Sequence, residues 1–257
     1  MTIQEDDAIV LDVRTQRESD RSVLLLTGRG ERLFAWAPGA ARSVRRFGAA
    51  LQPGARVRAR WRRRGESALP VLEEAHLTGA PPRPDPLERY YASAHVLEVV
   101  AALAREGQED PRLYRLTARV LDRLAAGDPP APLCRYLEAW MLRLAGLLPD
   151  LARCDASGEP LAGRAARITP QHGLVADGPG VRGWPLGPAA RRWLEATRHA
   201  APDAVDTPDR EAAAELEHAL PALIEAFTER PLRALRAWRR LERGPAAPDG
   251  IPGEPER

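Results

Sequence analysis

The chain contains no lysine and no asparagine, so all 38 of its basic residues are arginine. Each basic side chain is therefore a planar guanidinium, which can fork onto phosphate or stack on a flat ring. Only two cysteines occur, Cys134 and Cys154, so we expect no disulfide framework. No apolar run approaches the ~18 residues of a membrane-spanning helix, and the first ten residues lack the basic start and apolar run of a secretory signal. We expect a cytoplasmic protein that does not contact a membrane.

Catalytic motifs are also missing from the sequence. It contains no G-x-x-x-x-G-K-[ST], no G-x-S-x-G and no H-E-x-x-H. The five histidines are scattered along the chain. These absences favour a binding protein over an enzyme, and we expect neither catalytic residues nor a cofactor.

Positive charge is concentrated in one segment of the chain. Ten arginines and no Asp or Glu lie between Arg32 and Arg64, although the formal net charge of the whole chain is only +2. Such a cluster repels itself unless an anion lies beside it, and a nucleic-acid backbone is the obvious candidate. The sequence therefore predicts a DNA-binding surface made of Arg42, Arg45, Arg46, Arg56, Arg58, Arg60, Arg62, Arg63 and Arg64.

The first 80 residues have the pattern of short β-strands separated by turns, which is typical of a small barrel such as an OB-fold. The expected strands are Ala8–Val13, Ser22–Thr27, Leu33–Ala37, Ala55–Arg62 and Leu69–Leu77. Strict alternation in the fourth strand places its arginines on one face and Val57, Ala59 and Trp61 on the other. We expect Trp61, Phe34 and Trp36 in the barrel core, and base stacking is the alternative role for all three.

A proline-rich segment, residues 80–86, predicts a stiff linker, and beyond it the periodicity becomes helical. We expect a barrel domain over residues 1–79, a helical domain over 87–243 with an irregular stretch over 149–188, and a disordered tail over 244–257. The expected helices are Leu87–Ala104, Pro111–Ala126, Pro132–Ala145, Ala189–His199, Asp209–Phe227 and Pro231–Arg243.

The segment Cys154-Asp155-Ala156-Ser157-Gly158 has the outline of a zinc knuckle in which serine occupies the second thiol position. A structural zinc ion needs four nitrogen or sulfur ligands, and His172 adds only one candidate. We therefore expect no bound metal at Cys154 and His172. Cys134 lies in a helical pattern and is expected to be a small buried hydrophobe.

The last predicted helix carries arginines on one face and large apolar residues on another. One interpretation is an ordinary amphipathic helix docked on the domain. The other, which we weigh equally, is a second contact for nucleic acid or for an acidic peptide. The arginines in question are Arg233, Arg236, Arg239, Arg240 and Arg243.

Several short motifs resemble the bacterial RecO family of recombination mediators. The loop Pro38–Arg46 leads into Leu51-Gln52-Pro53-Gly54, as in the family's N-terminal part, although Pro38 stands where the family usually has lysine. The most specific stretch is Arg135-Tyr136-Leu137-Glu138 with Leu142, Leu144, Gly146, Leu147, Pro149-Asp150-Leu151 and Cys154. A late segment, Arg230-Pro231-Leu232-Arg233-Ala234, is also similar. Many members carry zinc-binding cysteines where this chain has Ser157, Ala176 and Pro179, so the resemblance implies that packing replaces metal there.

The resemblance implies an α+β protein: an N-terminal OB-fold barrel, then an all-helical domain with a degenerate zinc-finger-like insertion. It implies a nucleoid-associated mediator of DNA repair that binds single- and double-stranded DNA and anneals complementary strands. Its implied partners are RecR and the C-terminal tail of the single-strand-binding protein, with which it helps to load RecA. Two alternatives stand beside it, an RNA-binding OB module and a protein-interaction scaffold that binds no nucleic acid.

Salt dependence separates binding to nucleic acid from the scaffold alternative. Neutralising about five phosphates of a single strand predicts a log–log slope of affinity against salt near −3.5.

Overall fold

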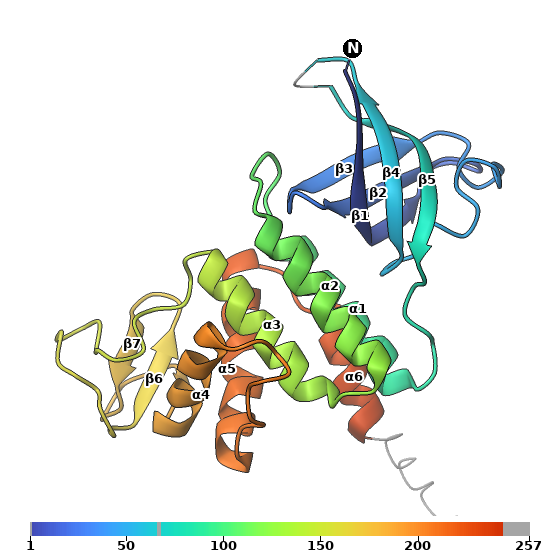
Figure 1. Ribbon diagram of the computed structural model, residues 1–257. Helices are drawn as coiled ribbons and strands as arrows, with labels where there is room; N and C mark the ends of the chain where they lie inside the picture. The colour runs from blue at the N-terminus through green and yellow to red at the C-terminus, as the bar shows by residue number, and fades with distance from the viewer. Residues whose placement is uncertain (1, 66–67, 244–257) are drawn as a thin grey trace, which may run out of the picture.

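The computed structural model describes residues 2–65 and 68–243; the predicted tail lies outside this range. Five strands close into a barrel in the order β1-β2-β3-β5-β4, which confirms the predicted small barrel (Figure 1). All neighbouring strands pair antiparallel except β3 and β5, which run parallel. The strands are β1 (Thr2–Thr15), β2 (Arg21–Thr27), β3 (Arg32–Ala37), β4 (Arg56–Arg63) and β5 (Val71–Gly79).

The barrel core is filled by the inward residues of all five strands. In β4 the predicted alternation holds, because Val57, Ala59 and Trp61 are buried while the arginines between them are not. The Trp61 indole donates its hydrogen bond to the Gln4 side chain at 3.0 Å, so its polar edge is satisfied at the rim of the core.

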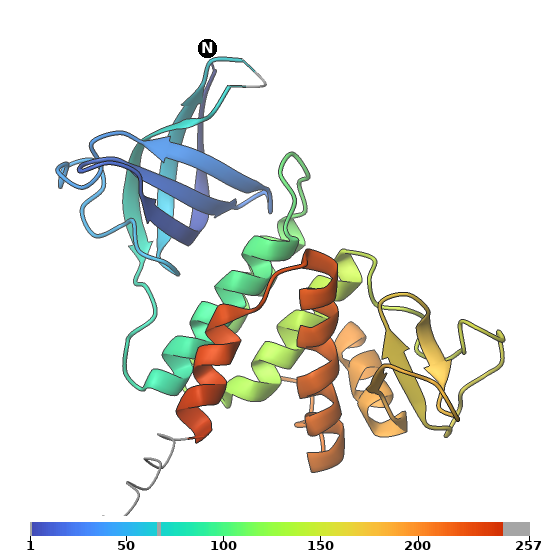
Figure 2. The same ribbon diagram turned by 180° about the vertical axis from the view of Figure 1, so that it is seen from behind.

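The described residues contain six helices, close to the six predicted ranges. Asp110 and Asp209 cap two of them by accepting hydrogen bonds from first-turn backbone N–H groups. Helix α6 packs along α1 and runs beside it in Figure 2. None of the described helices combines the length and the apolar character needed to cross a bilayer. The helices are α1 (Leu87–Leu103), α2 (Pro111–Ala126), α3 (Pro130–Leu144), α4 (Pro188–His199), α5 (Arg210–Thr228) and α6 (Arg233–Arg243).

The stretch between α3 and α4, predicted to be irregular, contains a small sheet of three strands in the order β7-β6-β8. Its strands are β6 (Ala166–Thr169), β7 (Gly173–Ala176) and β8 (Trp184–Pro185). They are too short to produce a readable alternation. A buried arginine of α4, Arg191, donates hydrogen bonds to the carbonyls of Leu151, Ala162 and Arg164 and so ties this stretch to the helices.

The barrel packs directly on the helices. Ile9, Leu11 and Leu26 point out of the barrel and join the hydrophobic core of the helical part. At the same junction Arg32 donates to the Ala101 carbonyl at 3.1 Å. The turn after β2 lies against the segment between α1 and α2, where Arg29 pairs with Glu109 at 3.3 Å.

This turn supplies a stability prediction at Gly30. Its φ is +83°, and an added Cβ would lie 1.8 Å from the Asp110 carbonyl oxygen. We expect Gly30→Ala to lower the free energy of unfolding by about 1–3 kcal/mol, from strain and overpacking, measured by urea denaturation. Gly163→Ala is the matched control, because a Cβ there meets nothing within 4 Å. Equal losses in the two variants would contradict the tight junction.

Candidate nucleic-acid interface

The arginines of β4 lie on the outer face of the barrel, as the alternation predicted. The premise that they lack acidic partners is wrong. Carboxylates approach them from the two neighbouring strands, β1 and β5, which are distant in sequence from β4 but adjacent to it in the barrel. The ion pairs are Arg58 with Glu5 (2.8 Å) and Asp7 (3.3 Å), Arg60 with Glu73 (3.4 Å) and Glu74 (3.3 Å), and Arg62 with Glu73 (2.9 Å).

These pairs hold the guanidiniums in place, and the carboxylate partners can be exchanged for another anion. The hydrogen bond from Arg58 holds the pKa of Glu5 below its ordinary value, and the same contact raises the pKa of Arg58. Because Arg58 and Glu5 are exposed, solvent and salt screen their attraction, and this pair contributes little to stability; Arg62, Glu73 and Glu74 are half-buried. An incoming phosphate can therefore replace the Glu5 carboxylate beside Arg58 at small cost.

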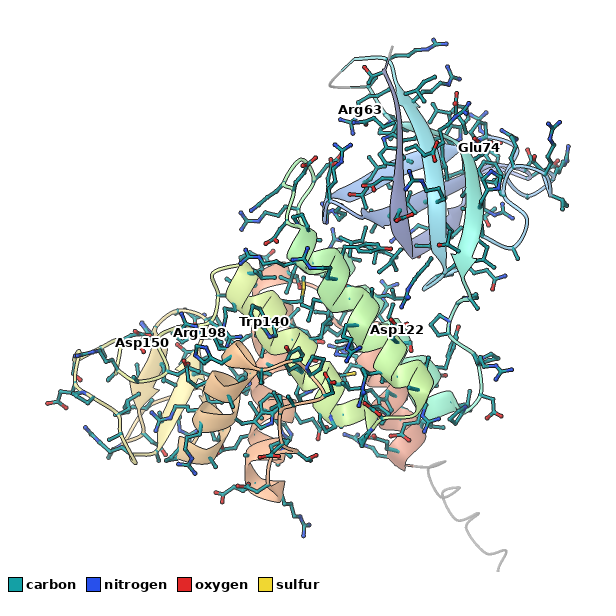
Figure 3. All side chains as sticks on the ribbon, in the orientation of Figure 1. Arg63, Glu74, Asp122, Trp140, Asp150 and Arg198 are labelled. Carbon is teal, nitrogen blue, oxygen red and sulfur yellow. The ribbon has the colours of Figure 1, made fainter. Side chains whose placement is uncertain are left out.

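Arg56 is set apart from the other β4 arginines by its contacts with α2. Its guanidinium lies 2.5 Å from the Asp122 carboxylate and 3.0 Å from the Ala118 carbonyl. Figure 3 labels Asp122 on the helical part, below the barrel. Arg56 therefore helps to hold the barrel on the helical part.

The loop after β3 holds three more of the predicted arginines. Arg46 folds back onto the loop: it donates to the Pro38 carbonyl at 2.8 Å and lies over the Phe47 ring at 5.0 Å. Arg42 is exposed and pairs with Glu18 at 3.2 Å. Arg45 is exposed and forms no ion pair within residues 2–65 and 68–243. The loop thus has a fixed base and a cationic outer edge.

At the far end of β4, Arg63 lies on the upper part of the barrel and Glu74 on β5 (Figure 3). Arg64 is exposed, and the part of the chain that the structure describes gives it no ion pair. Residues 1–79 contain fourteen arginines and ten Asp or Glu, a formal charge of +4. The barrel therefore remains positive after its internal pairs are counted.

A hollow of about 340 Å³ lies between β4, β5 and the β3–β4 loop. It brings Arg46 of the loop next to Arg60 and Arg62 of β4. Glu73 and Glu74 also line it, so its charge is mixed. The structure thus groups these three predicted arginines, while it places Arg56 against α2 instead.

The aromatic residues of the barrel divide into two groups. Trp61 is 4% exposed, so its predicted place in the core is confirmed. For Phe34 and Trp36 that prediction is wrong, since they are 40% and 37% exposed. In β3 the smaller residues Leu33, Ala35 and Ala37 point inward and the aromatics between them point outward. The period-two pattern of this strand was the signal that could have found them.

The segment of residues 154–158 forms a turn. The Gly158 N–H donates to the Cys154 carbonyl at 2.7 Å, and the Cys154 N–H donates to the Glu159 carbonyl at 2.9 Å. Nowhere in the described residues do three or more His, Cys, Asp or Glu side chains gather as metal ligands would. Cys154 and His172 line an open groove of about 1420 Å³. Cys134 is wholly buried, as predicted, and Cys154 is itself only 4% exposed.

The two thiols differ in environment, which predicts different reactivity. Hydrogen bonds from the Ser157 hydroxyl and from backbone N–H groups lower the pKa of Cys154 to about 7, whereas burial raises the pKa of Cys134. We expect methyl methanethiosulfonate to modify folded protein at Cys154 alone, with a rate that reaches half its maximum near pH 7. Mass spectrometry of timed samples measures this. Cys154→Ser should abolish labelling, and a rate that rises only above about pH 8.5 would contradict the assigned environment.

Helix α6 docks on the helical part through Leu235 and Trp238, and the Glu98 carboxylate caps its first turn by accepting from the Arg233 and Ala234 N–H groups. The amphipathic interpretation is therefore confirmed. The second contact stays a prediction. Within the described residues, Arg236 and Arg239 pair with glutamates of α5, whereas Arg233, Arg240 and Arg243 form no ion pair.

These features define a class of protein in which a small β-barrel with an arginine-rich outer face precedes a helical part into which a small three-stranded sheet is inserted. Comparison with known families identifies it further. The model of the recombination protein O N-terminal region matches residues 1–81, and that of the recombination protein O C-terminal region matches residues 85–238. The chain belongs to the RecO family, and the resemblance found in its motifs is confirmed.

Individual relatives agree with this assignment. The DNA repair protein RecO of Koribacter versatilis is 35% identical over 164 residues, 63% of this chain and 67% of the relative. That of Desulforudis audaxviator is 36% identical over 173 residues, 66% of this chain and 68% of the relative. That of Geobacter sulfurreducens is 34% identical over 190 residues, 73% of this chain and 77% of the relative.

Proposed function

We propose that the protein mediates DNA repair by homologous recombination. In this role it binds single- and double-stranded DNA, anneals complementary strands and, with RecR, helps to load RecA onto DNA coated with single-strand-binding protein. The names of its relatives and its membership of the RecO family support the repair role. The observation that carries the DNA-binding part is the arginine-rich outer face of the barrel.

We assign DNA binding to residues 1–79 as an OB-fold, treat residues 80–86 as the linker, and assign partner binding to the helical domain, residues 87–243. The acidic C-terminal tail of the single-strand-binding protein is the partner proposed for the latter. The insertion over 149–188 is, on this proposal, a zinc-knuckle fold that packing maintains: Arg191 and the Cys154 turn supply contacts that hold it.

The mechanism is electrostatic and involves no covalent step, so the protein acts as a binding factor and not as an enzyme. Phosphates displace Glu5 from its exposed pair, and Glu73 and Glu74 from half-buried pairs, and take their place beside the guanidiniums. Each strand that binds loses part of its charge repulsion toward a second strand. Two complementary strands held in this way can approach and pair.

The test is the annealing of two labelled complementary oligonucleotides, each coated with single-strand-binding protein, in the presence of increasing salt. We expect the protein to accelerate annealing and the acceleration to fade with salt. Binding to a single strand should follow a log–log slope near −3.5 if about five phosphates are neutralised. Equal or tighter binding to RNA would indicate an RNA-binding module, and no binding at low salt would indicate a scaffold.

A further inference from the structure

We propose that the outer face of β3 is a base-stacking platform, formed by Phe34 and Trp36, that makes the barrel select single strands over duplex. This inference rests on the proposed DNA binding and adds the class of strand that the site takes. Both rings are more than one-third exposed, whereas Leu33, Ala35 and Ala37 of the same strand are buried in the barrel core. Aromatic rings on a barrel face are the groups on which unpaired bases stack.

The spacing of the two rings favours an unpaired strand. Phe34 and Trp36 are two positions apart on one strand and share its outer face. A strand rises about 3.3 Å per residue, so their Cα atoms are roughly 6.6 Å apart along it. Successive bases of a duplex are only about 3.4 Å apart and are already stacked on one another. Two bases can therefore occupy both rings only when the nucleic acid is stretched and unpaired.

The neighbours of the rings suit a nucleic-acid strand. Trp36 lies in register with Val71 of β5, and Val71 lies opposite Arg62 of β4, so these three side chains form one outward row across three strands. On the other side of the platform, Leu24 of β2 lies opposite Phe34 and is half-buried. An apolar floor bordered by a guanidinium is complementary to bases joined by phosphates.

Arginines also lie near the end of the platform where β3 ends at Ala37. The chain leaves β3 at Ala37 and enters the loop that carries Arg45 on its outer edge. The hollow lined by Pro38, Val71 and Arg62 borders the same end. A mostly apolar protein partner would offer no negative charge to these arginines. A nucleic-acid strand whose bases lie on the rings places its phosphates within reach of the guanidiniums.

The experiment compares three fluorescein-labelled probes on the full-length protein: a thymidine 30-mer, an abasic strand of the same length, and a 30-base-pair duplex. We expect the wild type to bind the thymidine strand at least about tenfold more tightly than the abasic strand. The double variant Phe34→Ser with Trp36→Ser should bind the thymidine strand and the abasic strand with the affinity that the wild type has for the abasic strand. Its affinity for the duplex and its salt slope should be unchanged. Phe34→Tyr with Trp36→Phe should restore the difference.

Val44→Ser is the matched control, because Val44 is an exposed apolar residue of the loop after β3 and should not alter any of the three affinities. Equal, salt-sensitive binding of the thymidine and abasic strands by the wild type would overturn the stacking platform and leave the proposed DNA binding intact. Failure to bind any probe at low salt would overturn the proposed function itself. The wild-type comparison decides between these outcomes even if the double variant does not fold.

Discussion

Replacing Glu138 by alanine should lower the free energy of unfolding by about 3–5 kcal/mol, the range for breaking a buried ion pair by removing one partner. Glu138 is wholly buried between α1 and α3. One of its carboxylate oxygens lies 2.5 Å from His95 Nε2 and 2.8 Å from an Arg135 nitrogen. Without the carboxylate, the guanidinium of Arg135 stays in the core, and among the described residues only the Glu217 carbonyl, at 3.3 Å, remains as its partner.

Urea denaturation followed by circular dichroism measures this loss. Glu195→Ala is the matched control, since Glu195 is an exposed glutamate that pairs with Arg198 at 3.5 Å and should change stability by less than about 0.5 kcal/mol. The triple variant His95→Leu, Arg135→Met, Glu138→Leu should recover much of the loss, because an apolar core needs no charge compensation. A loss below about 1 kcal/mol in Glu138→Ala would contradict the role given to this cluster.

The same cluster explains the most specific motif of the sequence. Arg135 and Glu138 are three residues apart and so lie on one face of α3, where they meet His95 of α1. The buried positions of this motif therefore fix how α1 and α3 pack. They lie in the core of the helical part, so the motif carries the resemblance to the family without belonging to the arginine surface of the barrel.

Periodicity predicted the barrel and the helices because it reports which side of an element is buried. It failed at the start of β1, which begins at Thr2 and not at Ala8. Glu5, Asp6 and Asp7 interrupt the apolar pattern there, yet each pairs in register with a residue of β4. A strand segment whose residues are mostly polar can be recognised only when the strand that pairs with it is known.

The acidic partners of the arginines were missed for the same reason. The segment from Arg32 to Arg64 contains no carboxylate, but barrel closure brings β1 and β5, which carry the acidic partners, to the two sides of β4. Register between strands distant in sequence is set by the whole barrel, so no local pattern contains it. The exposed aromatics are a different case, since the alternation of β3 was readable and the expectation that large rings are buried overrode it.

Reversing the charge of Arg45 and Arg64 together, to glutamate, should weaken DNA binding roughly 10–100-fold at low salt and flatten the salt slope by about 1.4 if each contacts one phosphate of a single strand. These two arginines are exposed and, among the residues described, form no ion pair, so their replacement breaks no ion pair there. Arg56 is unsuitable for this purpose, because its reversal would place a carboxylate beside Asp122 at the junction with α2.

Fluorescence anisotropy against a salt series measures both quantities. Arg153→Glu with Arg192→Glu makes the same change in net charge at exposed positions of the helical part and should leave affinity and slope near wild type. If this control loses as much affinity as the barrel variant, long-range charge and not contact is responsible, and the barrel surface is not the binding site. If affinity falls with an unchanged slope, the two arginines steer the strand without neutralising its phosphates, and the contacts must be sought among the paired guanidiniums of β4.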